Sequence, residues 1–207
     1  MPAEPTAKRT VSFIDGQALF HGIKFAFGYT FPNFDPVALS KAICDRAGFT
    51  LTATRFYSGI PSKFDDPRWN SVWARKLAYM GSRGVHVYTR PLKYSPQTVT
   101  TASGPTTLKV PREKGIDVRI ALDVVRLARE QQCDVHLIFS QDQDLREVVD
   151  EVRAISASQS RWIKVICAFP ESDTYTNQWG IHKCDWHRFD KTLYDSCLDP
   201  NTYPFDC

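Results

Sequence analysis

Long apolar runs are absent from this chain of 207 residues, and no stretch approaches the length that a membrane span needs. Residues 1–10 are polar, contain proline and have no apolar core, so we expect a disordered tail there, neither a signal peptide nor an anchor. The six cysteines are widely spaced with no CxxC pair, which predicts reduced thiols in a cytoplasmic protein that is not bound to a membrane.

The chain also lacks a large excess of charge of one sign, because its formal net charge is only +3. Composition alone therefore does not identify a nucleic-acid-binding protein, and only a local cluster of cations would. The length suits one domain, which we place at residues 11–207. We expect this domain to carry a hairpin insertion at about residues 91–111 and a C-terminal extension at about residues 171–207.

Segments with the patterns of strands and helices alternate along the chain. Proline after aspartate predicts helix starts at Pro36 and Pro67, and apolar spacing predicts further helices from Ile116 and around Val148. Residues 20–34 have no clean period and are typical of a loop or a short irregular helix. Predicted strands cover residues 11–14, 51–57, 85–89, 134–139 and 162–169.

This alternation predicts an α/β fold. We expect a three-layer sandwich with a mostly parallel central sheet and helices on both faces. Residues 91–111 break the alternation around Ser103-Gly104-Pro105, which favours a β-hairpin. The last part of the chain should return to the edge of the sheet as a short helix and a short strand.

Aspartates occur at the ends of three predicted elements that are far apart in the sequence. Asp15 follows the first apolar strand, Asp117 lies at the start of a helix, and Asp142 and Asp144 follow the strand ending at Phe139. Ligand sites of open parallel sheets lie at the carboxyl ends of the strands. Carboxylates gathered there repel one another unless a divalent cation neutralises them, so we predict a site for Mg²⁺ or Mn²⁺.

Helix capping is the alternative interpretation of each aspartate. A single aspartate at a helix start, such as Asp142 or Asp144, most often only caps the helix. Asp15 precedes no predicted helix start and Asp117 follows Gly115 inside one, so capping alone does not account for all four. Asp123 is turned away from Asp117 on the same helix, and we expect it to support the site or to face solvent.

The segments Phe13-Ile14-Asp15-Gly16, Lys114-Gly115-Ile116-Asp117 and Phe139-Ser140-Gln141-Asp142-Gln143-Asp144 resemble the three signature segments of the NYN domain family. This LabA-like family is part of the PIN-like nuclease superfamily. The resemblance covers about residues 10–170 in the expected order. It implies a PIN-like Rossmannoid fold and metal-dependent cleavage of RNA.

The resemblance also implies roles for individual side chains. Asp15, Asp117 and Asp142 would be catalytic metal ligands, with Asp144 as a further ligand or as a partner of one. The hydroxyl of Ser140 would brace the cluster. No histidine or cysteine nucleophile would be required.

One position departs from the family pattern. Members usually carry asparagine three residues after the first aspartate, where this chain has Ala18. Either the neighbouring Gln17 substitutes for the missing amide or the activity is reduced.

Cations flank the second aspartate segment and are candidates to bind substrate phosphates. Arg112, Lys114 and Arg119 are all close to Asp117 in the sequence. Lys114 is the preferred contact, although a solvated charge in a loop explains it equally well.

Further basic and aromatic residues are interleaved between residues 63 and 94 and could form a track for single-stranded or structured RNA. Two of the aromatic residues, Trp69 and Trp73, are four residues apart and more typical of a core, whereas Tyr94 on the hairpin is a better candidate for stacking. The track comprises Lys63, Arg68, Arg75, Lys76, Arg90 and Lys93 with Phe64, Trp69, Trp73, Tyr88 and Tyr94.

Three functions therefore compete. The first is a metal-dependent ribonuclease, and the second is an RNA-binding or regulatory module with weak or no catalysis, which Ala18 favours. The third is a small-molecule phosphohydrolase, which usually has a second aspartate where Gln17 stands. A homodimer is left open.

Overall fold

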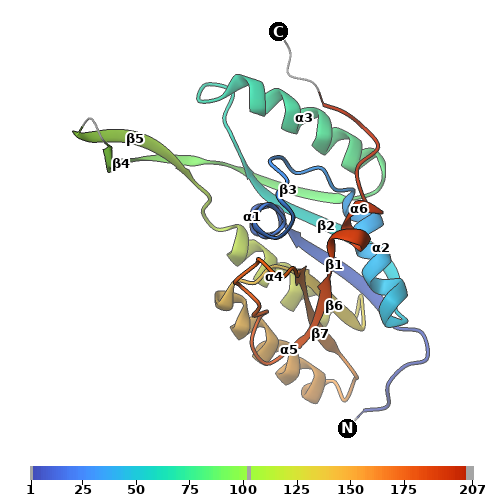
Figure 1. Cartoon of the computed structure of the whole chain (residues 1–207). Helices are drawn as coiled ribbons and strands as arrows, with labels where there is room; N and C mark the ends of the chain where they lie inside the picture. The colour runs from blue at the N-terminus through green and yellow to red at the C-terminus, as the bar shows by residue number, and fades with distance from the viewer. Residues whose placement is uncertain (1, 102–103, 204–207) are drawn as a thin grey trace.

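The protein is described by a computed structural model that covers residues 2–101 and 104–203 (Figure 1). Its centre is a six-stranded sheet in the order β3-β2-β1-β6-β7-β8, in which every neighbouring pair is parallel. The strands are β1 (Arg9–Asp15), β2 (Thr50–Ile60), β3 (His86–Pro91), β6 (Val135–Phe139), β7 (Lys164–Pro170) and β8 (Asp185–Phe189).

Helices cover both faces of this sheet. Because side chains alternate along a strand, Phe13 of β1 packs with the helices of one face and Ile14 with those of the other. The first face carries α4 (Ile116–Arg129) and α5 (Arg146–Ser158). The second carries α1 (Gly16–Phe27), α2 (Pro36–Ala47), α3 (Pro67–Ser82) and α6 (Lys191–Asp195). The predicted three-layer α/β sandwich is thus confirmed.

The predicted hairpin is also present. Strands β4 (Lys93–Thr101) and β5 (Gly104–Arg112) pair antiparallel with each other in a sheet of their own. In Figure 1 this hairpin projects away from the body of the molecule. Its base lies between β3 and the start of α4 in the sequence, so it extends from the carboxyl-end edge of the sheet.

The first helix differs from the prediction. The sequence predicts a loop or a short irregular helix over residues 20–34, whereas the structure has a regular helix, α1, from Gly16 to Phe27. It buries Leu19, Ile23 and Ala26 on one face and ends at Gly28, whose φ of 79° is left-handed. Exposed Phe25 interrupts the apolar period, which is why the pattern was not recognisable.

The first strand also begins earlier than predicted. β1 starts at Arg9, inside the expected tail, because Asp134 accepts hydrogen bonds from both the backbone N–H and the guanidinium of Arg9. At the other end of the chain, β8 and α6 are the predicted short strand and helix at the sheet edge. Among the described residues no helix is both long and apolar enough to span a bilayer.

The strand order places a ligand site. From β1 the chain proceeds to β2 and β3 on one side, and from β6 it proceeds to β7 and β8 on the other. Crevices outside the carboxyl ends of the two central strands are where open α/β sheets bind ligands. Ile14 is in register with Phe139, so Asp15 and Ser140 leave the sheet side by side.

Candidate acidic site

Asp15 is the last residue of β1 and is almost fully buried, with 6% of its surface exposed. The pKa of its carboxyl is raised from 3.8 to about 6. Burial is the largest cause, the negative charges of Asp142 and Asp117 act in the same direction, and hydrogen bonds from the backbone N–H groups of Ala18 and Gln17 oppose them. Carboxylates from all three sequence segments are therefore close enough to act on one another.

Capping is part of this geometry, contrary to the prediction that no helix starts directly after Asp15. Its Oδ1 accepts a hydrogen bond from the backbone N of Ala18 at 2.9 Å and caps α1. Asp142 similarly caps the short 3-10 helix η1 (Gln143–Leu145). A carboxylate that serves only as a cap has a lowered pKa, whereas the pKa of Asp15 is raised, so capping does not explain its burial beside other carboxylates.

The loop after β6 presents Asp142 at the surface. The Ser140 hydroxyl is buried and accepts a hydrogen bond from the backbone N of Asp142 at 3.2 Å. The carbonyl of Ser140 accepts one from the thiol of Cys167. Asp144 is exposed, and its backbone N donates to Oδ1 of Asp142 at 2.9 Å, so its contact with the site is through that bond.

Glu113 joins the site and was not predicted. Its Oε2 accepts a hydrogen bond from the backbone N of Gly59 in β2. Burial raises the pKa of Glu113 from 4.5 to about 7, and the charges of Asp15 and Asp117 contribute. A Cβ at Gly59 would lie 2.7 Å from that Oε2, so a larger residue there would push the Glu113 carboxylate away from this backbone. Glu113 directly precedes the second segment, which is the one signal that could have revealed it.

The donor chemistry of these carboxylates fits Mg²⁺ or Mn²⁺, which prefer oxygen ligands. Their present arrangement is looser than a coordination sphere: among residues 2–101 and 104–203, no group of three or more His, Cys, Asp or Glu side chains is arranged to hold a metal ion. The support for a cation site thus comes from the crowding of negative charge and from the type of donor atom, and not from the distances between the side chains.

Of the other predicted substrate residues, Gln17 lies beside the acidic site, and Lys114 and Arg112 flank Glu113 in the sequence. The amide of Gln17 lies 3.5 Å from the carbonyl oxygen of Gly59, beside Glu113. Lys114 is exposed in the loop before α4. Arg112 is exposed at the end of β5, where its register partner is Lys93.

Asp123 is buried rather than facing solvent, which corrects one of its two predicted roles. Its carboxylate pairs with Arg55, Arg119 and Arg126 and accepts a hydrogen bond from the Tyr57 hydroxyl at 2.8 Å. Burial alone would raise its pKa, but the hydrogen bonds from Tyr57 and Arg119 lower it on balance. The residue anchors a group of arginines on α4 and β2.

A cavity of about 570 Å³ lies next to Asp142, between α1 and the loop after β7. Gln141 holds that loop, because its Nε2 donates to the carbonyls of Asn177 and Trp179 and its Oε1 accepts from the Tyr175 hydroxyl. This loop has no apolar period, so its position at one side of the cavity could not be predicted from the sequence. The lining residues include Ala18, His21, Gly22, Phe25, Gln141, Asp142, Thr174, Tyr175, Thr176 and Asn177.

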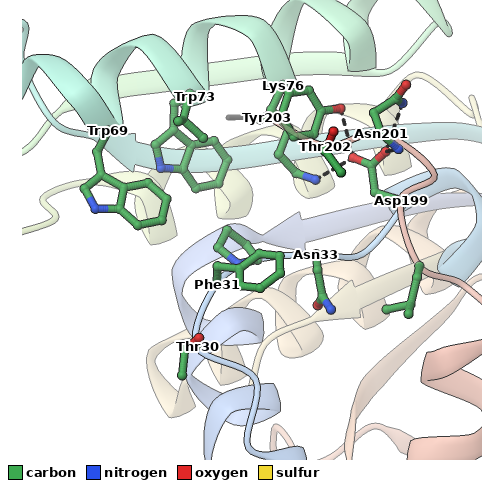
Figure 2. A pocket seen from close by; sticks show the side chains of 13 residues that line it. Thr30, Phe31, Asn33, Trp69, Trp73, Lys76, Asp199, Asn201, Thr202 and Tyr203 are labelled. Carbon is green, nitrogen blue, oxygen red and sulfur yellow. Dashed lines mark hydrogen bonds and ion pairs between the residues drawn. The ribbon is translucent and has the colours of Figure 1, made fainter. Parts of the chain in front are cut away.

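Another cavity, of about 580 Å³, is apolar and lies away from the acidic site, between α3, residues 30–33 and residues 198–203 (Figure 2). It contains part of the predicted track. Lys76 is buried there in an ion pair with Asp199 at 2.6 Å, so it is unavailable to phosphate, which corrects the predicted track. Trp69 and Trp73 line the cavity, and Trp73 packs against the core as predicted.

Comparisons with known proteins agree with this fold. The family described as NYN domain matches residues 9–173. A protein of unknown function, VPA0982 from Vibrio parahaemolyticus RIMD 2210633, has a similar structure with a TM-score of 0.52 and 18% sequence identity, covering 95% of this chain and 99% of that one. At that identity the likeness shows the fold alone.

Two further structures are too distant to support any conclusion. MurG of Acinetobacter baumannii has a TM-score of 0.28 at 9% identity, covering 80% of this chain and 37% of its own. An acetyl xylan esterase (Est2A) from the rumen bacterium Butyrivibrio proteoclasticus has a TM-score of 0.34 at 11% identity, covering 94% and 62%. No protein with a curated description matches the sequence. Since the family match extends over most of the chain, the protein belongs to the NYN domain family, a group of PIN-like nucleases.

Proposed function

We propose that this protein is a metal-dependent ribonuclease that hydrolyses phosphodiester bonds of RNA at the acidic site. One observation carries the proposal. The buried carboxyl of Asp15 has its pKa raised to about 6 by burial and by neighbouring Asp142 and Asp117. Such crowding is unfavourable unless something positive neutralises it, and the family to which the chain belongs acts on nucleic acid.

The carboxylates of Asp15, Asp117 and Asp142 would hold Mg²⁺ or Mn²⁺, with Asp144 as a further ligand or a support of Asp142, and Glu113 beside them. When bound, the ion activates water and stabilises the charge that develops on phosphorus. All of these carboxylates are catalytic residues in this scheme.

The remaining residues would position the substrate. Lys114 and Arg112 are exposed cations at the rim and would bind phosphate oxygens. Ser140 fixes the loop that presents Asp142, and Gln17 supplies an amide next to Ala18. We place the activity in the cytoplasm, because the five cysteines of the described residues are all free thiols.

The test is cleavage of a labelled single-stranded RNA by the full chain with Mn²⁺ or with EDTA. Asp142→Asn keeps the cap on η1 and should abolish metal-dependent cutting. Asp185→Asn is the matched control, because it makes the same change on an exposed surface at the opposite end of the sheet, and it should cut like the parent. Equal cutting by Asp142→Asn and the control would overturn the proposal.

One observation favours a second function, RNA binding without turnover. Ala18, which replaces the usual asparagine, lines the cavity beside Asp142 and offers no side-chain hydrogen bond there. RNA retained uncut in the same assay would support this function. A chromogenic phosphate monoester run in parallel separates both from a phosphohydrolase, which would turn over the monoester alone.

A further inference from the structure

Tyr88 of β3 organises two arginines next to the acidic site. The guanidinium of Arg119 lies over the Tyr88 ring at 5.0 Å from its centroid, and Nε of Arg90 donates to the Tyr88 hydroxyl at 2.9 Å. Because one face of the ring is occupied by a guanidinium, Tyr88 is a support for arginines rather than the base-stacking residue of the predicted track.

Arg90 reaches the start of α4. A Cβ placed on Gly115 would lie 2.8 Å from Nη1 of Arg90, which shows how closely the guanidinium approaches this backbone, and the φ of 74° at Gly115 is one that favours glycine. Gly115 is two residues before Asp117. The exposed guanidinium of Arg90 is thus adjacent to the segment that presents the second aspartate.

Outside the acidic site, the arginines near Tyr88 share a single carboxylate. Arg119 pairs with Asp123, but Asp123 also serves Arg55 and Arg126, so one carboxylate balances three guanidinium groups before Arg90 is counted. The side chains of Arg119 and Arg126 remain 36% and 48% exposed. A guanidinium binds phosphate oxygens with its planar N–H donors, and these side chains are exposed enough for a phosphate to reach them.

The hairpin base extends this positive surface. Lys93 of β4 is directly opposite Arg112 of β5, and like charges in that position destabilise a hairpin. Residues 93–112 contain no aspartate or glutamate to offset them. Outside the hairpin, Asp65 and Asp66 act on the neighbouring Tyr94, and Glu113 follows Arg112, so the carboxylates at this base come from other elements. The two opposed cations offer an external anion two positive groups at one place.

We infer that Arg90 and Arg119, held on Tyr88, together with Lys93 and Arg112 at the hairpin base, bind successive phosphates of one single-stranded RNA as it leaves the acidic site. The inference rests on the proposed function for its choice of anion. It moves the RNA path from α3, where Lys76 is buried, to the edge formed by β3, the hairpin base and α4.

The test measures binding of a fluorescent single-stranded RNA to the full chain carrying Asp142→Asn, across a series of salt concentrations. Adding Arg90→Gln should weaken binding about tenfold and reduce the slope of log Kd against log salt by about 0.7, the value for one phosphate contact on a single strand. Lys93→Gln should act in the same way. Arg90→Lys should preserve the slope but weaken binding, because lysine retains the positive charge but lacks the planar guanidinium that donates two parallel hydrogen bonds to a phosphate.

Arg129→Gln is the matched control, because Arg129 is the last residue of α4, the helix that carries Arg119, and pairs with Glu151. Its affinity and salt slope should equal those of the parent, and equal values for Arg90→Gln would overturn the inference. Arg90 contacts a neutral hydroxyl rather than the buried Asp123, so its replacement should leave the unfolding midpoint unchanged. If the chain cuts RNA while Arg90→Gln binds normally, only this inference fails; if Arg90→Gln weakens binding but no variant cuts, only the proposed nuclease fails.

Discussion

Replacing Asp15 with asparagine should stabilise the metal-free protein. The folded state raises the pKa of this carboxyl from 3.8 to about 6. Folding therefore favours the protonated form, and the cost of keeping Asp15 ionised grows as pH rises from 4 to 6 and is constant above that. At pH 8 the raised pKa lowers the free energy of unfolding of the wild type by about 3 kcal/mol. Asparagine removes the charge and still accepts the hydrogen bond from Ala18.

The assay is thermal or denaturant unfolding of wild type and Asp15→Asn in EDTA. At pH 8 the variant should be more stable by up to about 3 kcal/mol, or roughly 6–12 °C in melting temperature for a chain of this size. At pH 4 the difference should fall below about 1 kcal/mol, since both proteins are then neutral at this position. Adding Mn²⁺ should stabilise only the wild type. The reasoning would be refuted if the variant were less stable than wild type at pH 8 in EDTA, or if the difference in unfolding free energy between the two proteins were the same at pH 4 and pH 8.

Further predictions concern the other buried charges. Glu113→Gln should keep an acceptor for the backbone N–H that it contacts but lower Mn²⁺-dependent cleavage by about tenfold or more, measured as kcat. Asp123→Ala should cost about 3 kcal/mol in urea unfolding because it leaves the largely buried Arg55 and the buried Tyr57 hydroxyl without their partner, whereas Asp150→Ala on the exposed face of α5 should not move the midpoint. Lys76→Met should cost about 3 kcal/mol by removing the cation paired with the Asp199 carboxylate, which keeps its hydrogen bonds from Asn201 and Tyr203, and adding Asp199→Asn should restore part of that loss. Full additivity of the two changes would contradict the ion pair.

The layered fold was predictable because its signals are local. Pro36 and Pro67 follow aspartates that cap α2 and α3 as expected, and buried strands such as β6 are continuous apolar runs. The start and the regularity of α1 were not predicted, because an exposed phenylalanine, Phe25, interrupts its apolar face. Tertiary contacts decide which face of a helix is buried. Where aromatic residues lie on both the buried and the exposed face, the apolar period in the sequence does not show which face that is.

The acidic site was predictable only in part. Asp15 and Asp142 follow buried strands, and adjacency of β1 and β6 brings them together as parallel topology requires. Glu113 enters through its hydrogen bond to the backbone of β2, and Asp123 is buried because arginines from two elements converge on it. Contacts of that kind depend on register and side-chain direction, which no spacing in the sequence specifies.

The most direct test of the central claim is anomalous diffraction from a crystal soaked in Mn²⁺. The acidic site should show one or two peaks bounded by the carboxylates of Asp15, Asp117 and Asp142, at the carboxyl ends of β1 and β6. Absence of any peak there, at a concentration of Mn²⁺ that supports cleavage of RNA in solution, would contradict the claim that these carboxylates share a divalent cation.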